Sequence, residues 1–226
     1  FPAKAVKHLA EITGIDFRNS EDLIAATSDC GSYVALSSAV KSLAVKLTKV
    51  CNDLRLLASG PRTGLSELIL PQLQPGSSIM PGKVNPVIPE VVNQVAFRVI
   101  GNDLTVTIAS EAGQLELNVM EPVITFALYM QMKVMTNACN HLREKCIDGI
   151  VVNAEHCKDL VMGSLGIITI LKPHFGYKPC ANIAREGFLT GKSLHQLVVE
   201  EKQMLTQEQW DKVFTYENLI NPKFEK

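Results

Sequence analysis

Residues 76–86 combine side chains and turn-forming residues that suit a site acting on an anion. They read Gly-Ser-Ser-Ile-Met-Pro-Gly-Lys-Val-Asn-Pro, which places hydroxyls at Ser77 and Ser78, a lysine at Lys83 and an amide at Asn85. A backbone can approach a ligand closely beside a glycine, and successive N–H groups in such a turn form a concavity that binds anions. We therefore interpret this segment as a loop that binds a negatively charged substrate and brings a hydroxyl to it.

Two other interpretations of the loop fit less well. A phosphate-binding P-loop has four residues between its glycines and a Ser or Thr after the lysine. Here five residues separate Gly76 from Gly82, and Val84 follows Lys83. A proline-rich connector whose serines only cap turns would account for a bare Gly-Ser-Ser, but not for the whole string.

The chain before the loop has the period of helices. Residues 2–13 predict a short amphipathic helix that Gly14 ends in the left-handed conformation. Ser20 to Asp22 form a helix start, and apolar residues then recur at helical spacing to the stop signal at residues 59–61. The pattern predicts one helix of about forty residues, which is typical of a long bundle.

Residues 60–89 have no such period, and they hold six of the eleven prolines and four of the fourteen glycines. Connections this long are uncommon in compact domains and are usually functional. The helix predicted next, from Pro89 to about Ala112, is apolar around most of its circumference. That pattern favours burial on most sides, and in a chain of this size it indicates packing against other subunits.

The rest of the chain also predicts helices and shows no strand pattern. The expected helices are Glu121 to about Ile147, Asn153 to about Leu171, and three short ones over residues 180–190, 193–202 and 206–214. Thr206 and Gln209 form a capping-box pattern at the start of the last one. The sequence thus predicts an all-α fold, with a long-helix bundle domain over residues 1–171 and a small C-terminal helical domain over residues 172–226.

Composition limits the partners. The net charge is −1, from 22 basic and 23 acidic residues, so the chain lacks the basic excess that nucleic acid or an anionic membrane requires. The apolar runs are far shorter than the roughly 20 residues that span a bilayer, no signal peptide is visible, and Phe1 stands where an initiator Met is expected, which suggests a processed or truncated piece. The six cysteines include no CxxC pair, which predicts reduced thiols in a cytoplasmic protein rather than disulfides or metal ligands.

The string at residues 76–86 is similar to the signature of the fumarase/aspartase superfamily, whose members eliminate a group from the carbon next to a carboxylate and release fumarate. Residues 27–31, 52–57, 59–62 and 101–103 also resemble this superfamily. Within it, residues 89–95 and 111–123 look like the aspartase (aspartate ammonia-lyase) family and not like fumarases. A fumarate hydratase, or a non-catalytic bundle like the lens crystallins recruited from this superfamily, remains an alternative. The intact loop argues against the non-catalytic bundle.

The resemblance implies a reaction and roles for the loop residues. The reaction is the reversible deamination of L-aspartate to fumarate and ammonia, without a cofactor or a metal. Ser77 matches the general base, which acts as an alkoxide on Cβ and generates an enediolate. Ser78 and the backbone N–H of Met80 match groups that stabilise charge and order the loop, and Lys83 and Asn85 match groups that bind the other carboxylate. Glu90 matches a glutamate that orients an active-site histidine supplied by another segment.

The resemblance also implies that different subunits of a homotetramer contribute three sequence regions to each site. Only the third region is present here, so we expect an N-terminally truncated chain that is inactive alone but still associates through its long helices. We also expect the loop over residues 76–86 to be mobile without its partners.

The histidines and three of the glutamates are further candidates for catalysis, and their spacing favours structural roles. None of the five histidines has an acid or a serine at a spacing that would form a catalytic pair. The histidines are His8, His141, His156, His174 and His195. Glu111, Glu116 and Glu121 are five residues apart, which does not keep them on one helix face. We predict a structural role for both groups.

Overall fold

The computed structural model describes residues 1–221 apart from residues 75, 77–78 and 81. The described chain is mostly helical with long helices packed together, as the sequence predicts, and it divides into two compact units, Phe1–Val152 and Asn153–Lys226. The division falls between Val152 and Asn153, earlier in the chain than the domain boundary expected between Leu171 and Lys172. The core of the second unit gives the reason.

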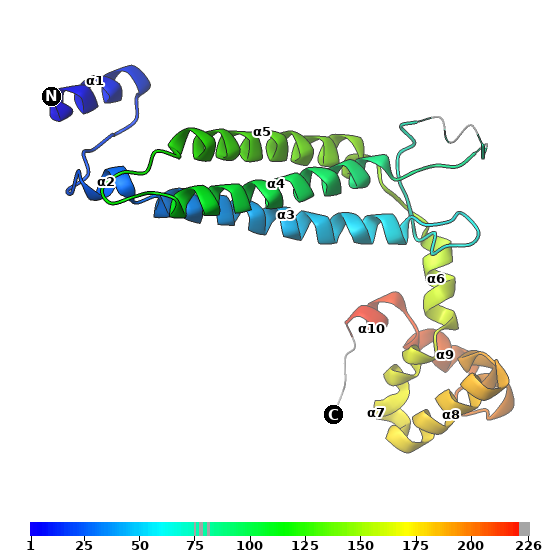
Figure 1. Ribbon diagram of the computed structural model, residues 1–226. Helices are drawn as coiled ribbons and strands as arrows, with labels where there is room; N and C mark the ends of the chain where they lie inside the picture. The colour runs from blue at the N-terminus through cyan, green and yellow to red at the C-terminus, as the bar shows by residue number, and fades with distance from the viewer. Residues whose placement is uncertain (75, 77–78, 81, 222–226) are drawn as a thin grey trace. The chain divides into compact units, whose positions relative to one another are not determined.

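Three long helices form the body of the first unit: α3 (Gly31–Leu57), α4 (Val87–Glu111) and α5 (Glu121–Lys145). They run side by side in Figure 1. The helices approach closely because small and β-branched side chains fill the space between them. The fully buried members of this core are Ala44, Cys51, Val92, Ala96, Val99, Val106 and Ile124.

The N-terminal part of the chain differs from the single long helix that the sequence predicts. Helix α1 (Pro2–Thr13) ends at Gly14 with φ 71°, as expected. The predicted helix of about forty residues is wrong, because the chain forms α2 (Ala25–Ser28) and then breaks before α3. Asp29 takes an extended backbone with ψ 113°, and its Oδ1 accepts a hydrogen bond of 2.8 Å from the N–H of Gly31. An aspartate side chain that accepts a hydrogen bond from a nearby N–H competes with the backbone hydrogen bonds of a helix. The spacing of apolar residues does not reveal this, so the break could not be predicted from it.

A pair of two-residue strands anchors the segment before the loop. Strand β1 (Leu68–Ile69) pairs antiparallel with β2 (Val151–Val152), which follows α5 and the short 3₁₀ helix η1 (Ile147–Gly149). Strands this short leave no alternating pattern in a sequence, so none was predicted. The pairing ties one wall of the loop region to the end of the bundle.

A buried polar network joins the three long helices. The Asp103 carboxylate on α4, 5% exposed as a residue, accepts from Ser37 Oγ at 2.8 Å and from Lys41 Nζ at 2.5 Å, both on α3. Gln131 Nε2 on α5 donates to Ser37 Oγ at 3.2 Å and to the Val99 carbonyl at 3.3 Å. These hydrogen bonds satisfy groups that would be costly to bury alone, and they are made at only one relative position of the helices along their axes.

The second unit consists of shorter elements. They are α6 (Ala154–Gly163), the 3₁₀ helix η2 (Leu165–Leu171), α7 (Lys172–Phe175), α8 (Tyr177–Thr190), the π-helical segment η3 (Gln196–Glu201), α9 (Gln207–Val213) and α10 (Tyr216–Ile220). The expected helix from Asn153 to Leu171 is interrupted at Ser164, whose Oγ accepts from the N–H of Gly166. The predicted capping box of Thr206 and Gln209 is confirmed.

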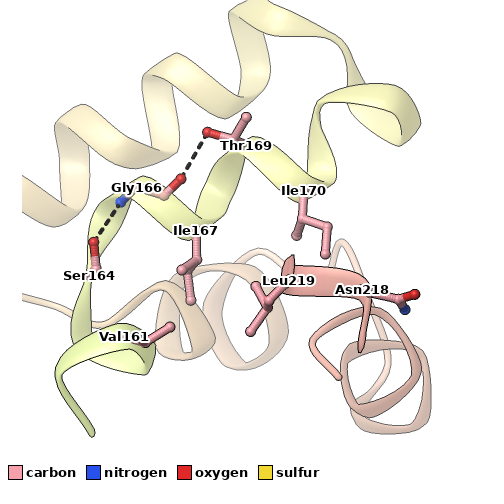
Figure 2. A pocket seen from close by; sticks show the side chains of 8 residues that line it. All are labelled: Val161, Ser164, Gly166, Ile167, Thr169, Ile170, Asn218 and Leu219. Atoms are coloured by element: carbon pink, nitrogen blue, oxygen red, sulfur yellow. Dashed lines mark hydrogen bonds between the residues drawn. The ribbon is translucent and has the colours of Figure 1, made fainter. Parts of the chain in front are cut away.

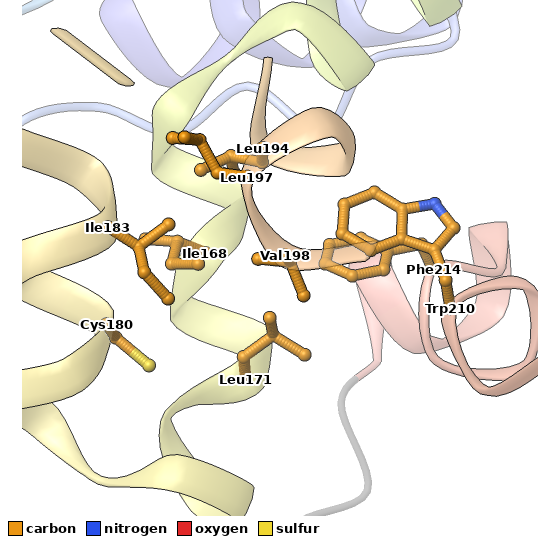
Figure 3. Close-up of a cluster of buried hydrophobic side chains, with 9 residues drawn as sticks. All are labelled: Ile168, Leu171, Cys180, Ile183, Leu194, Leu197, Val198, Trp210 and Phe214. Atoms are coloured by element: carbon orange, nitrogen blue, oxygen red, sulfur yellow. The ribbon is translucent and has the colours of Figure 1, made fainter. Parts of the chain in front are cut away.

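The core of the second unit explains where the chain divides. Trp210 stacks on Phe214 with ring centroids 3.8 Å apart, and Leu171, Leu194, Leu197 and Val198 are almost completely buried beside them (Figure 3). Ile168 and Leu171 of η2 belong to this same cluster, together with Cys180 and Ile183. Because η2 supplies part of the core, the unit begins before Lys172.

Two further properties concern the cysteines and the apolar character of the helices. All six cysteines are free thiols in the structure. Across residues 1–221, leaving aside residues 75, 77–78 and 81, no helix combines the length and apolar character needed to cross a membrane.

The Asp103 network predicts a large effect on stability. Replacing Asp103 with Ala leaves Ser37 without its acceptor and Lys41 without its counter-charge, so we expect the free energy of unfolding of the chain to fall by about 2–4 kcal/mol. Urea unfolding measures this change. Asp53→Ala is the matched control, since Asp53 forms an exposed i,i+4 pair with Lys49, and pairs of that kind contribute about 0.5 kcal/mol or less. An equal fall in the free energy of unfolding for Asp103→Ala and Asp53→Ala would contradict the stabilising role of the buried Asp103 network.

The buried thiol of Cys51 predicts a dependence of stability on alkaline pH. Burial, with a smaller contribution from neighbouring Cys146, raises the pKa of Cys51 from 9.0 to about 11. Below pH 9 the thiol is protonated in both the folded and the unfolded chain. Between pH 9 and 11 only the unfolded chain ionises, so the stability that this thiol contributes falls as the pH rises. Denaturant unfolding of the wild-type chain and of Cys51→Ala measures this effect. Between pH 8 and pH 10.5 the free energy of unfolding of the wild type should fall by about 2 kcal/mol more than that of Cys51→Ala. A difference between the two free energies that stays constant over this pH range would contradict the prediction.

Candidate functional site

The predicted catalytic loop lies between β1 and the start of α4. The structure describes Gly76, Ile79, Met80 and residues 82–86 of it, while Ser77 and Ser78 lie outside the described residues. The geometry of the predicted base and of the second hydroxyl, and the mobility expected of the whole loop, therefore stay predictions.

The second half of the loop is held against the start of α4. Gly82 has φ 81°, a left-handed conformation that glycine adopts without strain, and the N–H of Lys83 donates to the Met80 carbonyl at 3.2 Å. The N–H of Val87 then donates to the Asn85 carbonyl at 2.9 Å as the helix begins. These bonds order the turn that carries Lys83 and connect Asn85 to the first residue of α4.

Lys83 and Asn85 line one cavity of about 270 Å³. The opposite wall comes from the segment between α3 and β1 and from the residues just after β1. It includes Gly60, Ser66 and Gln72. Among the described residues, neither the Lys83 ammonium nor the Asn85 amide has a side-chain hydrogen bond or ion pair. Both groups are therefore available to a ligand, and together they suit a carboxylate.

The wall opposite the loop is a tightly hydrogen-bonded turn. Ser59 Oγ donates to the Leu56 carbonyl at 2.6 Å and accepts from the N–H of Leu65 at 3.0 Å. The N–H of Ser66 donates to the Ser59 carbonyl at 2.7 Å, and a side chain on Gly64 would meet the Ser59 backbone at 2.3 Å. The turn is thus closed on itself, and it gives the cavity a fixed side.

Glu90 lies in the first turn of α4, where its N–H donates to the Pro86 carbonyl at 3.2 Å. In the described part of the chain its half-buried carboxylate has no hydrogen-bond or ion-pair partner. His8 instead contacts Glu11, and His195 contacts Gln207. The role expected for Glu90, orienting a histidine from another segment, stays a prediction.

The glutamates at the other end of the bundle do not form a ligand set. Glu111 ends α4 and Glu121 begins α5, while the Glu116 carbonyl accepts from Thr27 Oγ1 at 2.7 Å. Within the part of the chain that the structure describes, no three His, Cys, Asp or Glu side chains are placed to hold a metal ion. The turn between the helices is instead organised by Asn118, whose Nδ2 donates to the Ala109 and Ser110 carbonyls.

A second cavity, of about 340 Å³, lies in the C-terminal unit (Figure 2). Its walls are mainly apolar, from Ile167, Ile170 and Leu219. The hydroxyls of Ser164 and Thr169 are already hydrogen-bonded to Gly166. This cavity therefore offers less to orient a charged substrate than the cavity beside the loop.

Sequence reasoning missed part of the site and part of its support. Gln72 and Ser66 line the cavity but stand outside the string of residues 76–86, in a segment with no periodicity to place them. Asn93 is 3% exposed, and its Nδ2 donates to Asn52 Oδ1 at 2.7 Å, while its own Oδ1 has no partner in the described part of the chain. The only signal for this pair was a polar residue on an otherwise apolar helix.

The chain resembles known proteins over nearly its whole length. Residues 1–101 match the family model described as lyase, and residues 167–221 match the model described as fumarase C C-terminus. The chain is 56% identical over 220 residues to the aspartate ammonia-lyase of Escherichia coli, covering 97% of the chain and 46% of that protein. It is 52% identical to the aspartate ammonia-lyase of Corynebacterium glutamicum, covering 98% of the chain and 42% of that protein.

Solved structures agree on the fold. A structure titled fumarate lyase:delta crystallin from Brucella melitensis, bound to cobalt, superposes with a TM-score of 0.91 at 42% identity, covering 98% of this chain and 47% of that chain. A class II fumarase from Schistosoma mansoni superposes with a TM-score of 0.87 at 31% identity, covering 97% and 49%.

The chain spans about half the length of the curated relatives it matches. Over nearly all of its own length, it is 52–56% identical to the aspartate ammonia-lyases of three bacteria.

Proposed function

We propose that the whole protein to which this chain belongs is an aspartate ammonia-lyase, which converts L-aspartate reversibly to fumarate and ammonia. One observation carries the proposal beyond homology. Lys83 and Asn85 belong to the loop that contains the predicted base; they line the same cavity, and their side chains have no partner among the described residues. A dicarboxylic substrate would supply the missing partner.

In the proposed reaction Ser77, as an alkoxide, removes a proton from Cβ of L-aspartate. The electrons of that C–H bond move onto the adjacent carboxylate and give an enediolate. The enediolate then collapses to form the double bond of fumarate, and the C–N bond at Cα breaks with its electron pair leaving on ammonia. A serine hydroxyl needs a lowered pKa for this role, and the N–H groups of the loop together with Lys83 are suited to favour its anion.

The other loop residues act on charge. We assign Ser78 and the backbone N–H of Met80 to the charge that develops on the carboxylate, where each preorganised donor contributes about 3–4 kcal/mol. Lys83 and Asn85 hold the second carboxylate by charge-assisted contacts. Glu90 orients a histidine from a segment outside this chain. No step in this scheme uses a cofactor or a metal.

The proposed enzyme is a homotetramer. Support comes from the long helices of the first unit, which carry large apolar side chains on their exposed faces. These side chains are Leu36, Leu43, Phe97, Leu104, Ile108, Phe126 and Tyr129. Helices with apolar residues on most sides are normally buried. A second copy of the same bundle has the same exposed apolar face, so the two faces can cover each other.

The activity is tested by the ultraviolet absorbance of fumarate after L-aspartate is added to the whole protein. We expect turnover with L-aspartate, and a fall in rate of about 10²–10⁴-fold in Ser77→Ala because the general base is lost. Ser42→Ala, on the exposed face of α3, is the matched control and should retain the wild-type rate. The 226-residue chain alone should form no fumarate.

Three results would count against this proposal. Turnover of malate but not of aspartate would favour the fumarate hydratase alternative. A Ser77→Ala variant at the wild-type rate would remove Ser77 as the base. A whole protein that turns over neither substrate would favour the non-catalytic bundle.

The proposed assembly is tested by light scattering on the chain itself. We expect a mass of four times the 24.8 kDa of one chain. Phe97→Glu places a charge on the exposed apolar face of α4 and should shift the mass toward that of a monomer. Phe188→Glu, at an exposed phenylalanine of α8 outside the bundle, should leave the mass unchanged. A wild-type monomer would contradict the proposal.

A further inference from the structure

Gly76 touches the backbone at the other end of the loop. A Cβ atom built on Gly76 would lie 2.2 Å from the carbonyl oxygen of Lys83 and 3.1–3.2 Å from its carbonyl carbon and nitrogen. Only a residue without a side chain can approach a peptide group so closely. We call this contact between Gly76 and the Lys83 peptide the loop neck.

The Lys83 side of the neck is a hydrogen-bonded turn that leads into α4. The N–H of Lys83 is hydrogen-bonded to the Met80 carbonyl, and two residues later the Asn85 carbonyl accepts from Val87 in the first turn of α4. The Lys83 peptide is therefore coupled to the end of a buried helix. Gly76 is in turn located by its contact with that peptide, and not by a side chain of its own.

The neck brings together groups that are distant along the chain. Ser77, the predicted base, follows Gly76 directly in the sequence, so it is one residue from the contact. Lys83 and Asn85, on the other side of the contact, line the cavity that we assign to the substrate. The distance between base and carboxylate-binding groups thus depends on how closely Gly76 approaches the Lys83 peptide.

We propose that Gly76 is a positioning residue for the lyase reaction, an inference that rests on the proposed function. Its missing side chain sets the separation between the attacking hydroxyl and the groups that hold the substrate's other carboxylate. In Gly76→Ala the Lys83 oxygen would have to move from 2.2 Å to at least 3.4 Å from the new methyl group to reach an ordinary contact. The contacting oxygen belongs to the backbone, so no flexible side chain can absorb this shift.

A displacement of about 1 Å between reacting groups can cost about 100-fold in rate. We therefore expect kcat of the whole protein to fall by about 100-fold in Gly76→Ala. Binding of succinate, a dicarboxylate that lacks the amino group, should change by less than about threefold, because Lys83 and Asn85 remain on the α4 side of the neck. Gly163→Ala is the matched control: it ends α6 with no atom within 4 Å of a new Cβ, and it should retain the wild-type kcat.

Thermal unfolding of each variant separates positioning from folding. The inference requires Gly76→Ala to unfold within about 2 °C of the wild type while kcat falls. A kcat within twofold of the wild type would overturn the inference and leave the proposed function standing. An unfolding temperature lowered along with kcat, or a parallel loss of succinate binding, would also overturn it, since the glycine would then be needed for folding or for binding. A wild-type protein that is inactive would overturn the proposed function and this inference together.

Discussion

The carboxylate of Asp103 joins the three long helices at one point along their length. It is almost completely buried, and it accepts from Ser37 and Lys41 of α3, while Gln131 of α5 donates to the same Ser37 hydroxyl. Apolar packing alone tolerates sliding of one helix along another, because it has no direction. A buried hydrogen bond does not, since a shift leaves a polar group unpaired. We infer that this network sets the register of α4, and the position of everything at its N-terminal end.

The loop region depends on that register. Lys83, Asn85 and Glu90 lie at or just before the start of α4, so their places follow from where the helix begins. The facing wall is held separately, by the hydrogen-bonded turn at Ser59 and by the pairing of β1 with β2. Two separately held walls leave a cavity between them, and the loop neck joins the predicted catalytic loop to one of these walls.

The sequence predicted the elements that depend on periodicity and local capping. The ends of α1 and the capping box at Thr206 are confirmed, and α4 begins two residues before the predicted start at Pro89. The breaks at Asp29 and Ser164 were not predicted, because in each a side-chain oxygen accepts a nearby N–H without changing the apolar pattern. For the cavity beside the loop, the loop string contains two of the residues that line it, Lys83 and Asn85. It could not identify Gln72 or Ser66, since their role comes from three-dimensional proximity in a segment without period. The closeness of Gly76 to Lys83 was also not visible, because a glycine in a loop has many possible uses.

We propose that the whole protein catalyses the reversible addition of ammonia to fumarate, with transfer of a proton at Cβ of L-aspartate. The reverse reaction in heavy water tests this most directly. Fumarate and ammonia incubated with the protein in D₂O should give L-aspartate with one deuterium at Cβ, seen by proton NMR as the loss of one Cβ hydrogen signal. Formation of malate without aspartate, or aspartate without deuterium at Cβ, would contradict the account.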